Sequence, residues 1–274
     1  MKRRSDSVHY EELTPPAELR GLVHRLWVLR GQAQAGGPFQ RAMPDGRSEL
    51  IFNFADPFEC VDGRSVRTQP LSLLVGPSRR AMAIRPTGRV DLVGIRFRPE
   101  ALAGWLRVRG AELADASFTL GEVPAPLDAT LHEQLAEAGS SRHRLTILVA
   151  HLAGPSSGPT DRRLSAAVDM ILGDGRARPE GIAGAVGLSR RQLGRLFQER
   201  IGIAPKSLGR LGRFQRALRA LDGNPRAPLA GVAARAGYFD QAHLCRDFRL
   251  FAGTTPAGYR REMRELTRHF LDSP

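Results

Sequence analysis

The spacing of hydrophobic residues changes along the chain and predicts two structurally different regions. Within residues 1–123, short apolar runs rich in β-branched and aromatic residues alternate with turn signals such as Pro44-Asp45-Gly46 and Pro86-Thr87-Gly88. Short strands at this spacing favour a small β-barrel or sandwich. The runs that we expect to form strands are Leu22–Leu29, Glu49–Phe54, Leu71–Val75, Ala81–Arg85 and Arg89–Phe97.

After this region, leucines recur at intervals typical of helices. A short helix containing Leu102 and Trp105 is expected after Pro99, and residues 124–152 carry leucines three or four positions apart. Residues 154–160 are rich in Gly, Pro and Ser and lack side chains able to build a core, which is typical of a linker. The predicted fold class is therefore α+β, with a β-rich domain and flanking helices at 1–153, a linker at 154–160 and an all-α domain at 161–274.

The all-α region contains an approximate internal repeat. Four positions match at an offset of fifty residues: Ile182, Ala183, Val186 and Gly187 correspond to Val232, Ala233, Ala236 and Gly237. The second copy then has one extra residue in its turn, and five further positions match at an offset of 51: Leu193, Arg195, Phe197, Gly202 and Pro205 correspond to Leu244, Arg246, Phe248, Gly253 and Pro256. Each copy predicts a helix, a glycine turn and a second helix, which is a helix-turn-helix motif.

The turn residues predict where the helices end and begin. Gly187 and Gly237 suit the left-handed backbone that ends a first helix. Ser189 and Asp240 are good N-caps for second helices, expected at about 189–201 and 240–251. A connecting helix, Pro205–Leu221, is expected between the copies because its leucines follow helical spacing.

Each second helix is expected to expose arginine opposite its apolar stripe, since successive residues turn by about 100°. An α-helix fits the major groove of DNA, and arginine can pair with guanine through two hydrogen bonds. The predicted base contacts near the helix starts are Arg191, Gln192, Arg195, Gln241, His243 and Arg246. Ser189, Arg190 and Asp240 lie at helix starts that can hold phosphates, and Gln198 and Arg249 share the outward faces.

The charge distribution supports this interpretation. Of the net charge of +13, most lies in residues 161–274, which hold 21 Arg and Lys against 11 Asp and Glu; residues 1–160 hold 20 against 17. A basic domain joined to a nearly neutral one is typical of nucleic-acid binding. An anionic membrane surface is the alternative partner, but no basic amphipathic tail or lipidation motif favours it.

The same sequence argues against other classes of protein. Cys60 and Cys245 are the only cysteines, too few for a disulfide framework or a thiolate zinc site, and the histidines show no metal-ligand spacing. No nucleophile elbow, phosphate loop or dinucleotide fingerprint occurs. We therefore expect no catalytic residue, metal or cofactor. With no signal peptide and no apolar run long enough to span a bilayer, a cytoplasmic location is expected.

Specific motifs in the repeat resemble a known family. The run from Ala236 to Leu244, followed by Phe248-Arg249, Gly253, Thr255-Pro256 and Tyr259-Arg260, resembles the second-motif signature of AraC/XylS transcription regulators. The first copy is similar to that family at Gly187-Leu188-Ser189, Leu193, Leu196-Phe197, Gly202 and Pro205. The resemblance covers residues 161–265. It implies a bacterial regulator with about seven helices in this domain, whose two recognition helices enter successive major-groove segments of double-stranded DNA.

The N-terminal part resembles, more loosely, a β-rich domain of unknown function that precedes this module in some members of the family. The likeness lies in Met43-Pro44-Asp45-Gly46, in residues 49–53 and in residues 93–99. It implies a cupin-like domain that senses an effector or joins two chains. The expected partners are operator DNA, a small-molecule effector of unknown identity, a second copy of the chain and RNA polymerase.

Several residues keep two interpretations. Asp45 and Arg47 either line a pocket or, as we favour, serve the turn, and Arg96 and Arg98 suit the solvent face of a strand. His243 contacts DNA or is an ordinary surface residue. Core packing is favoured over stacking on single-stranded bases for four aromatic residues: Tyr238, Phe239, Phe248 and Phe251. Two other functions are disfavoured. An enzyme that uses this module for targeting would need a cysteine-rich zinc site, which two cysteines cannot form. A protein-interaction domain that has lost DNA binding would not need Arg195 and Arg246, which are retained.

Overall fold

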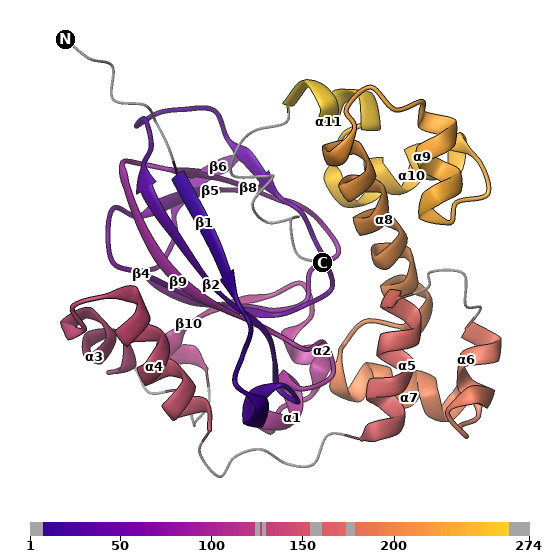
Figure 1. Ribbon diagram of the computed structural model, residues 1–274, viewed down its shortest axis with the longest axis horizontal. Helices are drawn as coiled ribbons and strands as arrows, with labels where there is room; N and C mark the ends of the chain where they lie inside the picture. The colour runs from indigo at the N-terminus through magenta and orange to yellow at the C-terminus, as the bar shows by residue number, and fades with distance from the viewer. Residues whose placement is uncertain (1–7, 124–126, 128–129, 154–160, 174–178, 263–274) are drawn as a thin grey trace.

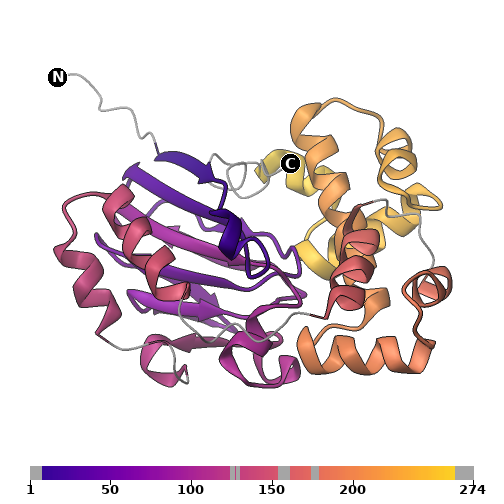
Figure 2. The same ribbon diagram turned by 60° about the horizontal axis from the view of Figure 1, so that its bottom comes forward.

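A computed structural model describes residues 8–123, 127, 130–153, 161–173 and 179–262. Figures 1 and 2 show a β-rich N-terminal part and a wholly helical C-terminal part lying side by side. The predicted linker, residues 154–160, lies outside the described residues. None of the described helices combines the length and apolar character needed to cross a bilayer.

Among the residues that the structure describes in the N-terminal part, ten strands form two antiparallel sheets. The larger sheet has the order β1 (Val8–Leu13), β2 (Val23–Gln32), β9 (Arg89–Phe97), β4 (Glu49–Asn53), β7 (Ser72–Val75) and β10 (Ser117–Thr119). The smaller sheet has the order β3 (Gln40–Ala42), β8 (Met82–Pro86), β5 (Phe58–Asp62) and β6 (Ser65–Thr68). The five expected strands are all present. Among the described residues the strands stay in two sheets and close no barrel, so the sandwich is the observed one of the two predicted forms.

Alternation along the central strands gives the larger sheet two buried faces. On β2, Leu26 and Val28 belong to one core cluster, whereas Trp27 and Leu29 belong to another that includes Phe58 of the smaller sheet. The first face is covered by helices of the same domain: α1 (Leu102–Leu106), α2 (Gly110–Leu113), α3 (Leu131–Glu137) and α4 (Ser141–Leu152). The second face looks toward the smaller sheet, because Trp27 and Leu29 pack against Phe58 of β5.

Seven helices make up the described C-terminal part, the number that the family resemblance implies. They are α5 (Arg162–Gly173), α6 (Pro179–Ala185), α7 (Arg190–Arg200), α8 (Pro205–Gly223), α9 (Leu229–Ala236), α10 (Gln241–Ala252) and α11 (Pro256–Glu262). The long helix α8 is the predicted connecting helix. Figure 1 shows α5, α6 and α7 at one end of it and α9, α10 and α11 at the other.

The N-terminal part contacts both halves of the helical part. Gln215 Nε2 on α8 donates to the carbonyl of Pro44 at 2.8 Å, and the amide of Ala81 donates to the carbonyl of Phe251 at the end of α10 at 2.7 Å. Arg98 forms an ion pair of 2.8 Å with Asp169 on α5. The N-terminal part therefore contacts α5, α8 and the end of α10.

Candidate nucleic-acid interface

The first helix-turn-helix unit consists of α6 and α7. Its turn contains Gly187 with φ of +67°, and the amide of Leu188 donates to the carbonyl of Ala183 at 2.9 Å to close the end of α6. Ser189 Oγ accepts the amide of Gln192 at 3.2 Å, and Gln192 Oε1 accepts the amide of Ser189 at 2.8 Å. This capping box confirms Ser189 as the N-cap and defines where α7 begins.

The second unit consists of α9 and α10 and repeats this geometry. Gly237 has φ of +84°, and the amide of Tyr238 donates to the carbonyl of Ala233 at 2.9 Å. Asp240 Oδ1 accepts the amide of His243 at 2.6 Å and caps α10. The cap residues of both units therefore use their side chains to start the second helix of the motif.

The side chains predicted to contact DNA project from the starts and outward faces of α7 and α10. Arg195 is 71% exposed and forms only a loose pair of 3.7 Å with Glu199. His243 is the half-buried member, and its ring meets the ring of Tyr238 edge-on at a centroid distance of 5.0 Å. The exposed members are Ser189, Arg190, Arg191, Gln192, Arg195, Gln198, Asp240, Gln241, Arg246 and Arg249.

The opposite faces of the same two helices lie in one hydrophobic core. Leu193 and Phe197 of α7, and Leu244 and Phe248 of α10, are all buried in it. Helix α8 connects the two units through this core, where the ring of Phe214 meets the ring of Phe248 edge-on at 5.0 Å. The shared core therefore holds α7 and α10 as parts of one body rather than as separate motifs.

An ion pair with a buried carboxylate links α8 to α10. Arg210 donates to Asp247 at 2.6 Å, and the Asp247 side chain is only 1% exposed. Further along, Tyr259 Oη donates to Asp222 at 2.9 Å and fastens α11 to the end of α8. Sequence reasoning missed these ties because no spacing rule connects an arginine on one helix to an acid 37 residues later.

The core-packing prediction is wrong for one aromatic residue of this region. Tyr238, Phe248 and Phe251 are buried as expected, but Phe239 is 94% exposed in the turn before α10. Cys60 and Cys245 are free and half-buried. The part of the chain that the structure describes holds no cluster of histidine, cysteine and carboxylate side chains suited to a metal ion.

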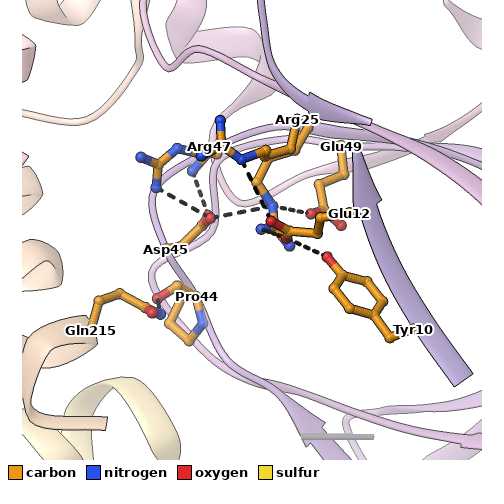
Figure 3. A network of polar contacts seen from close by, with 9 residues as sticks. Tyr10, Glu12, Arg25, Pro44, Asp45, Arg47, Glu49 and Gln215 are labelled. Carbon is orange, nitrogen blue, oxygen red and sulfur yellow. Dashed lines mark hydrogen bonds and ion pairs between the residues drawn. The ribbon is translucent and has the colours of Figure 1, made fainter. Parts of the chain in front are cut away.

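A second polar site lies inside the N-terminal domain (Figure 3). Arg96 is 4% exposed, so its predicted place on the solvent face of β9 is wrong. It lies on the inner face of the larger sheet, with its guanidinium group 2.6 Å from Glu49 Oε1, 3.2 Å from Glu12 Oε1 and 3.6 Å from Asp45 Oδ2. Tyr10 Oη donates to the same Glu12 oxygen at 2.5 Å.

Burial and neighbouring charges set the ionisation of this network. Burial raises the pKa of the Glu49 carboxyl even though Arg96 opposes the shift. Burial acts the same way on Asp45, but the guanidinium groups of Arg47 and Arg96 prevail and hold its pKa below the usual value. Asp45 also accepts the amide of Arg47 at 2.8 Å, so it serves the turn as we favoured.

The network borders a cavity of about 130 Å³ between the two sheets. Asp45 and Arg47 line this cavity while they shape the turn, so both of their interpretations hold. The apolar part of the lining includes Trp27, Leu29, Phe58, Leu73, Ile84 and Leu92. The charged part of the lining includes Asp45, Arg47, Glu49 and Arg96.

Two family models match the chain. Residues 182–262 match the family described as "Helix-turn-helix domain", and residues 11–119 match the family described as "Domain of unknown function (DUF6597)". An uncharacterized HTH-type transcriptional regulator of Haemophilus influenzae is 30% identical over 105 residues, which are 38% of this chain and 35% of that relative. The match thus spans about a third of the relative's length.

Comparison with solved structures gives matches at low sequence identity. ToxT from Vibrio cholerae has a TM-score of 0.48 and 9% identity, with 87% of this chain and 98% of that chain covered. A probable AraC family transcriptional regulator from Rhodopseudomonas palustris has a TM-score of 0.35 and 22% identity, with 38% of this chain and 99% of that chain covered. Together with the duplicated, capped motif, these matches show an AraC-type helix-turn-helix domain at residues 182–262 and a DUF6597 domain at residues 11–119.

Proposed function

We propose that this regulator reads a specific operator by placing α7 and α10 in successive major-groove segments of one DNA duplex. The observation that carries the proposal is that two capped helices bury apolar faces in a common core and leave their cationic faces exposed. Arg191, Arg195 and Arg246 are the proposed guanine contacts. Gln192, Gln241 and His243 add further base contacts, and Arg190, Gln198 and Arg249 lie beside the phosphates. Ser189 and Asp240 mainly orient the helices.

The experiment is genome-wide footprinting followed by gel-shift titration of the recovered site. Arg195→Ala and Arg246→Ala should each weaken operator binding by about 1–3 kcal/mol, because each removes a bidentate base contact. Arg142→Ala, an exposed arginine of α4 in the N-terminal domain, is the matched control and should bind like the parent protein. Operator binding no tighter than binding to random DNA at every salt concentration would overturn the proposal.

We also propose that a small, mostly apolar effector occupies the cavity between the two sheets. Support comes from its apolar lining and from the charged network at its border. Ala42, Pro44 and Met82 line the cavity, and the chain beside them contacts the DNA-binding part: Pro44 accepts Gln215 of α8, and Ala81 donates to Phe251 of α10. An occupant can therefore act on α8 and α10 through adjoining backbone.

A thermal-shift screen of small aromatic and aliphatic alcohols and acids tests this site. A ligand of the cavity should raise the Tm of the parent protein and fail to do so in Ile84→Trp, because the larger side chain fills the space. A compound that stabilises both proteins equally binds elsewhere.

We propose that the chain acts by binding rather than by catalysis, in the cytoplasm, together with RNA polymerase and a second copy of itself.

A further inference from the structure

Phe239 is a large aromatic side chain that the fold leaves in solvent. It is 94% exposed, whereas the other aromatic residues of the second helix-turn-helix unit, Tyr238, Phe248 and Phe251, are at most 5% exposed. A phenylalanine stabilises a folded protein only when its side chain is buried, so folding gains nothing from Phe239 in its observed position. Its position suggests a role outside the core.

Comparison of the two turns shows that Phe239 is the extra residue of the second unit. Leu188 and Tyr238 are equivalent, because both are buried and each donates its amide to the carbonyl five residues earlier at 2.9 Å. In the first unit the N-cap Ser189 follows Leu188 directly, whereas in the second unit Phe239 separates Tyr238 from the N-cap Asp240. The first turn is complete without such a residue, so the aromatic group is not needed to form the motif.

The place of Phe239 puts it at the start of the second recognition helix. Ala242 is exposed three residues later on the first turn of α10, and Gln241 is exposed between them. His243 is turned toward Tyr238 by the ring contact described above. Two apolar side chains thus stand at the end of the helix that usually reaches base edges. The apolar group that the major groove offers is the thymine methyl, which alanine and phenylalanine contact in DNA complexes.

We infer that Phe239 packs against a thymine methyl group in the half of the operator that α10 reads, and so selects thymine at that position. The inference rests on the proposed mode of DNA binding. The second helix-turn-helix unit thus makes an apolar contact with DNA. The first unit does not make this contact, because its turn has no inserted residue. A contact with deoxyribose instead of a base is the competing outcome.

The test replaces each thymine of the recovered operator by deoxyuridine, which removes only the methyl group. In the parent protein, one such replacement should weaken binding roughly 5- to 20-fold, within the range of a single mismatched base pair. Phe239→Ala should weaken binding to the unmodified operator by a similar factor and be insensitive to that replacement. Phe239→Leu, which keeps an apolar side chain, should retain more affinity than Phe239→Ala.

Controls separate this inference from the proposed function. Leu250→Ala removes another exposed apolar side chain of α10, 43% exposed, far from the helix start, and should bind like the parent. The Tm of Phe239→Ala should not change, because the side chain is in solvent. If Phe239→Ala loses affinity but no thymine methyl matters in the parent, the contact is with the DNA backbone and the inference fails. If Phe239→Ala binds normally while Arg246→Ala does not, the inference fails and the proposed function stands.

Discussion

Arg96 is the central charge of the N-terminal domain, because its guanidinium group joins three carboxylates in a buried site. Replacing it by methionine should leave Glu12, Asp45 and Glu49 facing one another without their shared cation. Breaking a buried ion pair by removing one partner costs about 3–5 kcal/mol. We expect Arg96→Met to lower the free energy of unfolding, measured with urea, by an amount in this range.

The matched control for this prediction is Arg67→Met. Arg67 pairs with Asp62 at 3.3 Å on the surface, where both side chains are more than half exposed. A pair of this kind contributes about 0–1 kcal/mol. Equal losses in the two variants would show that the Arg96 network is no more important to stability than a surface pair.

His24 lies close to the same network and predicts a dependence of stability on pH. Burial lowers its pKa to about 3, and the guanidinium groups of Arg47, Arg25 and Arg96 act in the same direction. Between pH 6.5 and 3 the unfolded chain therefore takes up a proton at His24 that the folded protein does not. This contribution to stability is complete above pH 6.5 and is lost as the pH falls, by at most about 1.4 kcal/mol per pH unit.

The comparison of urea unfolding at pH 7 and pH 5 tests this prediction. His24→Gln should lose less stability than the parent between the two values, because glutamine does not titrate. His143→Gln changes an exposed histidine of α4 and serves as the control. A parent and a His24→Gln variant with the same pH dependence would contradict the assigned cause.

At the scale of elements, the N-cap of α10 links the stability of the helix to the proposed DNA contact. Asp240→Ala removes the acceptor of the His243 amide and should cost about 1 kcal/mol of stability, whereas Asp240→Asn keeps an acceptor and should cost a few tenths. Operator affinity should follow the same order, because a frayed first turn displaces Gln241 and His243. The urea midpoint and a gel-shift titration of each variant measure both effects, and equal behaviour of the two variants would contradict them.

Local rules were sufficient for the helical elements. Gly187 and Gly237 in the turns, Ser189 and Asp240 as caps and Pro205 at the start of α8 act within one or two turns of chain, so the printed residues carry the information. Nonlocal features were not accessible in this way. The strands β1, β3 and β10 are defined by their pairing with β2, β8 and β7. Arg96 is buried because a second sheet covers the face of β9 on which it lies.

The candidate interface shows the same limit. Periodicity predicted which faces of α7 and α10 point outward, because an apolar stripe defines its opposite side. Periodicity could not show that Phe239 is exposed, since an aromatic residue in a turn is compatible with either place. The one-residue difference between the repeats was visible, and it was the available signal that this residue lies outside the shared motif.

At the scale of the whole molecule, the N-terminal domain holds the end of α7 through a contact between two backbones. Gly202 ends α7 with φ of +78°, and a methyl group placed on it would collide with the carbonyl of Gly110 in α2. The reverse also holds, since a Cβ at Gly110 would lie 2.6 Å from the amide nitrogens of Ile201 and Gly202. Only glycine on both sides permits this approach.

The matching glycine of the second unit provides the test, because Gly253 has a similar φ of +67° but nothing within 4 Å of its missing Cβ. Gly253→Ala should cost only the left-handed strain of about 1–2 kcal/mol. Gly202→Ala carries that strain and an overpacking cost of about 1–3 kcal/mol, which moves α7 away from α2. We expect faster hydrogen exchange at the amides of Ile201 and Gly202 and weaker operator binding in Gly202→Ala alone. Similar exchange and affinity in the two variants would mean that the N-terminal domain does not control the placement of α7.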